Sequence, residues 1–112
     1  MSAALDRSTA QIGAPDVWSA LYRGNGVDVA VLDTGADRSH PDLAGRVAGA
    51  EDFSGSGSNR DKFGHGTHVE SVVGGSGVCS GSTRRGVAPG ARLLVGKVLG
   101  DDGFAVVPRT PP

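Results

Sequence analysis

Two apolar runs of strand length, which lie far apart in the sequence, constrain the fold most strongly. The first, VDVAVL, covers residues 27–32 and is rich in β-branched side chains, and the second, ARLLVGKVL, covers residues 91–99. Runs of this length and composition are typical of strands that are covered on both faces. A weaker apolar pattern at residues 46–53 predicts another strand. The chain is therefore expected to build a sheet from segments that are distant in sequence.

Two other segments favour helices. Residues 15–22, PDVWSALY, begin with a proline that suits a first helical turn, and they stop shortly before a glycine. Apolar and small side chains at residues 66–73 allow a second helix, which two glycines end. Polar loops are expected at residues 54–62 and 76–86. The order helix, strand, strand, loop, helix, strand implies a parallel α/β sheet, in which ligands bind beyond the carboxyl ends of the strands.

The composition limits the size of the fold and the classes of partner. The chain has 112 residues, of which 19 are glycine, and this suits one small domain with many tight turns. Eleven basic and twelve acidic side chains leave a net charge of -1, so neither nucleic acid nor an anionic membrane is expected as a partner. Cys79 is the only cysteine, which excludes an internal disulfide.

The sequence contains no recognisable targeting segment. Its first residues lack the basic start and the apolar stretch of a secretory signal, and no run approaches the ~20 apolar residues of a membrane span. If it is translated as written, the chain is expected to be soluble and to stay in the cytoplasm.

Asp33 lies where the first predicted strand ends, directly before a threonine and a glycine. A carboxylate at the rim of a sheet can orient an imidazole and stabilise its charged form. An aspartate at this place can also cap the turn that ends the strand, because aspartate is a preferred turn residue. From the residues alone, both interpretations are open.

The segment HGTHV, residues 65–69, contains two histidines three positions apart. His65 lies between two glycines at the predicted start of a helix, where it can act as a general base or have a structural role. His65 and His68 share one side of that helix, so a metal site is a further alternative, although the motif lacks the glutamate of the zinc-protease pattern. A third ligand would have to come from a nearby acidic residue: Asp33, Asp61 or Glu70.

Three segments together resemble the subtilisin-like serine proteases, the subtilase family. They are VAVLDTGADRSHPDL at residues 29–43, HGTHV at residues 65–69 and GVAPGARLLVGKVL at residues 86–99, and they follow the order of the family. The resemblance implies an α/β fold, the N-terminal part of a doubly wound parallel sheet, at residues 1–103. A proline-rich tail at residues 104–112 lies outside the family pattern.

The resemblance also implies roles for two residues. Asp33 would be the aspartate and His65 the general base of an Asp, His, Ser triad that cleaves protein or peptide substrates. His68 would then be a residue of the helix and not a metal ligand. Members of the family are mostly secreted.

The nucleophile of the family lies in a Gly-Thr-Ser-Met-Ala-x-Pro motif, which these 112 residues do not contain. Ser76 and Ser80 are nearest to the histidine helix in sequence, but their glycine-rich loop has no strand-to-helix elbow. We therefore expect the chain alone to be inactive, because acyl transfer needs an attacking oxygen. The alternatives are a noncatalytic binding fragment and one half of a split protease that a separate serine-bearing piece completes.

The remaining expectations concern cofactors and packing. No cofactor is expected: Asp42 matches an aspartate that binds calcium in some family members, but the loop at residues 74–86 lacks their asparagine-rich pattern. Glu70 stands where family helices usually have a small residue, and burying an unpaired carboxylate is costly. The segment 91–99 is expected to be an unpaired edge strand, which would make the isolated chain unstable or prone to aggregate.

Overall fold

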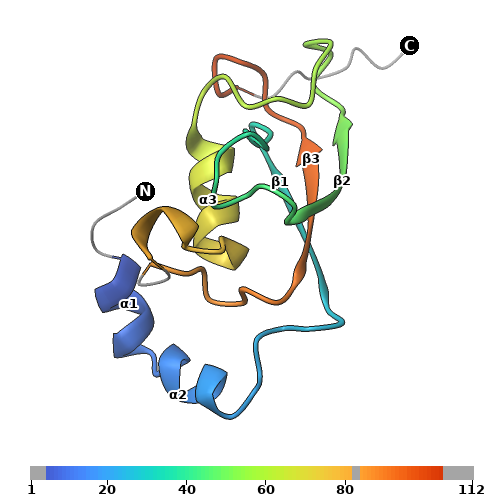
Figure 1. Cartoon of the computed structure of the whole chain (residues 1–112). Helices are drawn as coiled ribbons and strands as arrows, with labels where there is room; N and C mark the ends of the chain where they lie inside the picture. Colours follow the sequence, from blue (N-terminus) through green and yellow to red (C-terminus); the bar gives the residue numbers. More distant parts are fainter. Residues whose placement is uncertain (1–4, 82–83, 105–112) are drawn as a thin grey trace.

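The structure is a computed structural model that describes residues 5–81 and 84–104. Figure 1 shows its elements, which in chain order are α1 (Leu5–Gln11), α2 (Ala14–Ser19), β1 (Asp28–Asp33), β2 (Val47–Asp52), α3 (His65–Gly74), the 3-10 helix η1 (Val78–Ser80) and β3 (Arg92–Lys97). The three strands and α3 lie within two residues of their predicted bounds. Most of the predicted tail, residues 105–112, lies outside the described residues.

The three strands form one parallel sheet in the order β1-β3-β2. The prediction of an edge strand at residues 91–99 is therefore wrong, because β3 lies in the centre and β1 and β2 form the edges. In β3, four of the six residues are buried, which reflects the neighbours that it has on both sides. The register pairs Asp33 with Lys97 and Asp52 with Lys97, so the carboxyl ends of all three strands meet at one rim.

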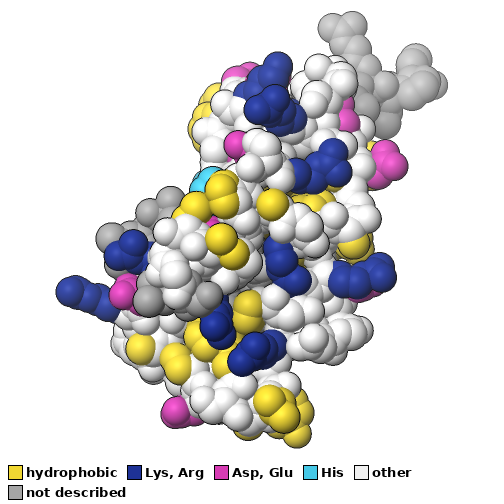
Figure 2. Space-filling model, viewed as in Figure 1, with side chains coloured by type: hydrophobic (Ala, Val, Ile, Leu, Met, Phe, Trp, Pro, Cys, Tyr) yellow, Lys and Arg dark blue, Asp and Glu magenta, His cyan; other side chains and the backbone are white. Residues whose placement is uncertain are grey.

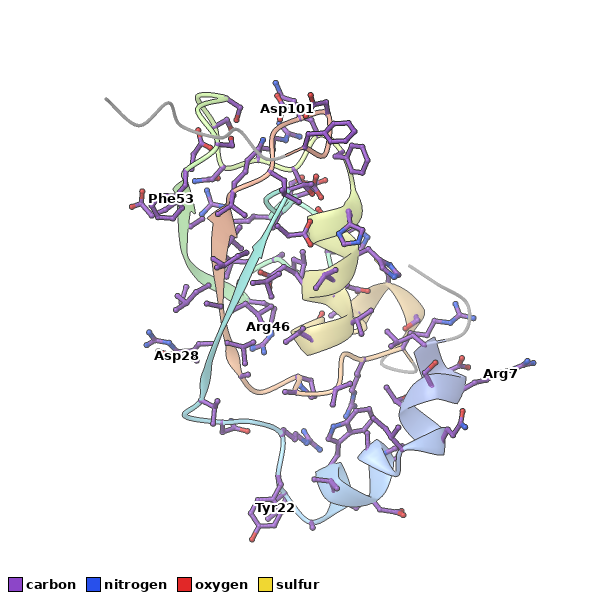
Figure 3. All side chains as sticks on the ribbon, turned by 180° about the vertical axis from the view of Figure 1, so that it is seen from behind. Arg7, Tyr22, Asp28, Arg46, Phe53 and Asp101 are labelled. Carbon is purple, nitrogen blue, oxygen red and sulfur yellow. The ribbon has the colours of Figure 1, made fainter. Side chains whose placement is uncertain are left out.

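Helix α3 packs on one face of this sheet, against β1 and β3 (Figure 1). The apolar cluster between them consists of buried and partly buried side chains: Val29, Ala36, Leu43, Val47, Ala50, Val73, Leu93 and Val95. Arg46, labelled in Figure 3, donates from Nε to the carbonyl oxygen of Gly74 at 3.1 Å and from its guanidinium to the carbonyl oxygen of Ala91. Arg46 thus joins the carboxyl end of α3 to the start of β3.

The opposite face of the sheet is apolar and open. Side chains alternate between the two faces of a strand, so Leu32 and Phe53 point away from the α3 side. Each of them is 66% exposed, and both are lining residues of a groove along the strands. In a doubly wound fold helices cover both faces, whereas within the described residues α3 covers one. The described part of the chain is a partial α/β fold.

The two N-terminal helices pack on each other beyond the amino ends of the strands (Figure 1). Trp18 of α2 donates from Nε1 to the carbonyl oxygen of Val87 at 2.9 Å, which attaches this pair to the loop before β3. Helix α1 was not predicted, and α2 ends at Ser19 and not at residue 22. Leu21 adopts a left-handed φ of 72°, which is incompatible with a continuing helix.

The distribution of charged side chains on the surface agrees with the net charge of -1 (Figure 2). Figure 2 shows lysine and arginine side chains scattered over one face and interspersed with apolar and acidic ones. Among residues 5–81 and 84–104, none of the helices has the length and the apolar character required to cross a membrane.

Candidate active site

Asp33 is the last residue of β1 and is almost completely buried. Its carboxylate oxygen Oδ1 accepts a hydrogen bond from the backbone N–H of Thr34 at 2.7 Å. Its backbone carbonyl oxygen accepts from the N–H groups of Val98 and Leu99, which follow the central strand, at 2.9 and 3.1 Å. The backbone of Asp33 is thus bonded to the segment after β3, and the N–H of Thr34 holds its carboxylate at the rim of the sheet.

His65 is the first residue of α3, and the helix start is fixed by side chains from elsewhere in the chain. The N–H of Gly66 donates to Thr34 Oγ1 at 2.8 Å, and the N–H of Thr67 donates to Asp61 Oδ2 at 2.8 Å. These are N–H groups of the first turn, which have no partner within a helix. A Cβ atom at Gly66 would collide with the carbonyl oxygen of Gly35, so glycine allows α3 to approach the end of β1 this closely.

Asp61 connects the three parts of this site, and the sequence analysis considered it only as a possible metal ligand. Its carboxylate accepts from Thr34 Oγ1 at 2.9 Å, from the N–H of Gly64 at 2.7 Å and from Thr67 Oγ1 at 2.6 Å. Burial acts to raise the pKa of Asp61, but these hydrogen bonds outweigh it and the pKa is lowered. An aspartate shortly before a predicted helix is the signal that could have indicated such a cap.

The imidazole of His65 faces the carboxylate of Asp33. His65 Nδ1 lies 2.8 Å from Asp33 Oδ2 and 2.9 Å from Asp33 Oδ1. The side chain of Asp33 is 12% exposed, whereas that of His65 is 60% exposed. With Nδ1 turned to a carboxylate, Nε2 is the ring nitrogen available for proton transfer at the surface. A buried carboxylate that orients an exposed imidazole is the arrangement that general-base catalysis requires.

Glu70 lies one and a half turns after His65 in α3 and is completely buried. Neither of its carboxylate oxygens has a hydrogen-bond partner among the described residues. Burial, and to a smaller extent the negative charge of Asp33, raise the pKa of Glu70 from 4.5 to about 7. The costly burial of Glu70 that the sequence indicated is thus present. The carboxyl group keeps its proton to a higher pH than an exposed glutamate does.

The residues that the sequence analysis considered as metal ligands do not form a metal site among the described residues. Within residues 5–81 and 84–104, no group of three or more His, Cys, Asp and Glu side chains is placed to hold a metal ion. Asp42 is buried, and its Oδ1 accepts from the N–H of Cys79 at 2.9 Å. Its carbonyl oxygen accepts from the N–H of Ser76 at 2.8 Å. Asp42 thus holds the loop that follows α3.

The two serines considered as nucleophiles follow the opposite end of α3. Ser76 lies just beyond the carboxyl end of this ten-residue helix, which spans about 15 Å from His65. Ser80 ends the 3-10 helix η1 that follows. Their place in the chain is therefore remote from the rim that carries Asp33 and His65.

One family model and several known proteins match this chain. The model described as "Subtilase family" matches residues 24–106. The "Major intracellular serine protease" of Bacillus subtilis (strain 168) is 41% identical over 96 residues, which are 81% of this chain and 30% of that protein. The "Intracellular serine protease" of Paenibacillus polymyxa is 42% identical over 104 residues, 88% of this chain and 31% of that protein.

A third relative, "Thermitase" of Thermoactinomyces vulgaris, is 39% identical over 95 residues, 83% of this chain and 33% of that protein. The chain thus spans about a third of the length of these relatives. Two of them are intracellular proteases by name, and a further relative is named a "Minor extracellular protease". The matched region contains both Asp33 and His65. The extent of the family match and the identity to these serine proteases show that the chain belongs to the subtilase family.

Proposed function

We propose that this chain supplies the aspartate and the histidine of a serine endopeptidase, and that the nucleophilic serine comes from a segment outside these 112 residues. The observation that carries the proposal is the contact of 2.8 Å between His65 Nδ1 and Asp33 Oδ2. In the reaction, Nε2 of His65 takes the proton of the serine hydroxyl as its oxygen attacks the peptide carbonyl carbon. Asp33 holds the ring in the required tautomer and stabilises the imidazolium that forms.

The expected substrate is a protein or peptide, and the chain alone is expected to be inactive. After the serine has attacked, His65 gives the proton to the leaving amine. Water then hydrolyses the acyl-enzyme, and His65 again acts as the base. Without a serine oxygen at the ring, the first step has no attacking atom. No cofactor is required for this chemistry. The names of two intracellular relatives favour a cytoplasmic site of action.

A second candidate function is that of a noncatalytic fragment that binds another polypeptide. The open apolar face of the sheet favours it, because Leu32 and Phe53 are largely exposed there. Large exposed apolar patches mark interaction surfaces in soluble proteins.

Labelling with a fluorophosphonate, which reacts with activated serines, separates the two functions. The chain is mixed with the part of the Bacillus subtilis relative that lies beyond the matched region. We expect no label on this chain alone and label on the added piece only in the mixture. The label should disappear with His65→Ala in this chain, whereas Arg92→Ala, far from the rim, should leave it unchanged. Complex formation without label would favour the noncatalytic fragment.

A further inference from the structure

The segments that precede the three strands meet at the amino edge of the sheet, opposite the rim that carries Asp33 and His65. They form an open cavity of about 420 Å³. Three arginines line it, one from each of these segments: Arg23 before β1, Arg46 directly before β2 and Arg85 before β3. The other lining residues, none of which is acidic, are Asn25, Ser76, Pro89 and Gly90.

Contacts between these segments fix the shape of the cavity. The N–H of Gly90 donates to the carbonyl oxygen of Arg23 at 2.7 Å. A Cβ atom at Gly90 would collide with the side chain of Asn25, so glycine allows the segments before β1 and β3 to come this close. The guanidinium of Arg85 lies 5.8 Å from the centre of the Trp18 ring, a cation–π contact that limits its freedom. The cavity is therefore largely preformed.

The guanidinium of Arg46 is partly buried and only partly used. Two of its N–H groups donate to the carbonyl oxygens of Gly74 and Ala91, and the others have no acceptor among the described residues. Burial lowers the pKa of Arg46, but an arginine keeps its charge at neutral pH. Because a cation that is partly removed from water is unfavourable without an anionic partner, this arrangement favours an anion in the cavity.

Among the residues that the structure describes, no carboxylate pairs with these three arginines. The ion pairs lie elsewhere: His65 with Asp33, Arg92 with Asp28 and Lys97 with Asp101. The chain as a whole has a net charge of -1, so the positive cavity is a local feature. Like charges that face one cavity repel each other, and a bound anion would remove this repulsion.

We propose that this cavity binds a compact anion with two linked phosphate groups, such as pyrophosphate or a small diphosphate ester. Guanidinium groups bind phosphate oxygens through pairs of N–H···O bonds. The arginines approach from three segments, and the oxygens of phosphate point in several directions, whereas those of a carboxylate lie in one plane. The cavity also lies within the range of about 300 to 1,000 Å³ that is usual for small-molecule sites. Binding at this edge does not depend on the function proposed above.

The test is calorimetric titration of the full chain with pyrophosphate at low salt, without divalent cations. We expect binding with a Kd of about 0.1 to 1 mM. Arg23→Gln and Arg85→Gln should each weaken it by about tenfold, because each removes charge-assisted hydrogen bonds. The matched control is Arg7→Gln, which removes an exposed arginine of α1 that points away from the sheet (Figure 3) and should bind like the wild type.

Circular dichroism shows which variants keep the wild-type fold, and the two cavity variants are judged separately, so misfolding of one leaves the other as the test. If about 10 mM pyrophosphate gives neither heat nor a rise in the melting temperature of the wild type, the proposal is overturned. Equal weakening in Arg7→Gln would also overturn it, because binding would then follow net charge. Citrate, which carries its charge on carboxylates, should bind about tenfold more weakly; equal affinity for citrate would refute the assignment to phosphate.

Discussion

The buried carboxyl of Glu70 predicts an unusual dependence of stability on pH, which a Glu70→Gln variant should abolish. The folded chain holds the proton of Glu70 up to a pH of about 7, whereas the unfolded chain releases it near 4.5. Between these values the folded state binds more protons than the unfolded state, so the free energy of unfolding falls as the pH rises. Glutamine carries no such proton, and its contribution is constant over this range.

The magnitude follows from the two pKa values. A pKa difference of one unit between the folded and unfolded states corresponds to about 1.36 kcal/mol. A pKa that is raised from 4.5 to about 7 therefore lowers the free energy of unfolding by about 3 kcal/mol at pH 8. Below pH 4.5 the loss vanishes, because both states then hold the proton. A loss of this size is a large part of the total stability of a small domain. From pH 4 to pH 8, the free energy of unfolding of the variant should therefore rise by about 3 kcal/mol relative to that of the wild type.

Urea unfolding followed by circular dichroism measures this difference at a series of pH values. The other carboxylates titrate in both proteins, so the difference between the curves isolates Glu70. Glu51→Gln, which removes an exposed carboxylate of β2, is the control, and its curve should run parallel to that of the wild type at all pH values. If the difference between Glu70→Gln and the wild type stays constant from pH 4 to pH 8, the carboxyl does not titrate as a buried group and the reasoning is refuted.

Three further predictions follow from other contacts. Asp61→Ala should lower the free energy of unfolding by about 1 to 2 kcal/mol, because it removes the acceptor for the first turn of α3; a urea midpoint equal to that of the wild type would contradict this role. Leu32→Ser combined with Phe53→Ser should reduce aggregation, measured by light scattering, because both side chains are exposed on the open sheet face; unchanged scattering would exclude that face as the cause. Asp42→Ala should lower the melting temperature, whereas added calcium should leave the wild type unchanged; a calcium-dependent rise would show that a metal binds.

The sequence predicted local structure better than it predicted how the elements are assembled. The strand at residues 27–32 and the helix at residues 66–73 have strong local signals, namely β-branched runs and glycine stops, and both lie within one residue of their observed bounds. The lateral order of strands has no such signal, because it depends on which segments pack together at long range. The segment 91–99 was therefore wrongly expected at the edge, although its apolar character suits the central strand that it forms.

The same distinction holds for the candidate site. Asp33 and His65 were singled out from their motifs, and the structure brings their side chains into contact although 32 residues separate them in the chain. Their catalytic role remains a prediction. The hydrogen bonds of Asp61 could not be derived from the sequence, because they join a loop, a strand end and a helix start. For Glu70, the departure from the family pattern indicated an unusual residue, but its unpartnered burial is visible only in three dimensions.

The most direct test of the proposed function is the rate of peptide hydrolysis by a chimera in which residues 24–106 replace the matched region of the Bacillus subtilis relative. The chimera should hydrolyse a peptide substrate, and His65→Ala or Asp33→Asn in the transplanted segment should each lower kcat by about 10⁴ or more. A folded chimera without activity, or one whose activity survives His65→Ala, would contradict the claim that this chain supplies the aspartate and the base of a serine endopeptidase.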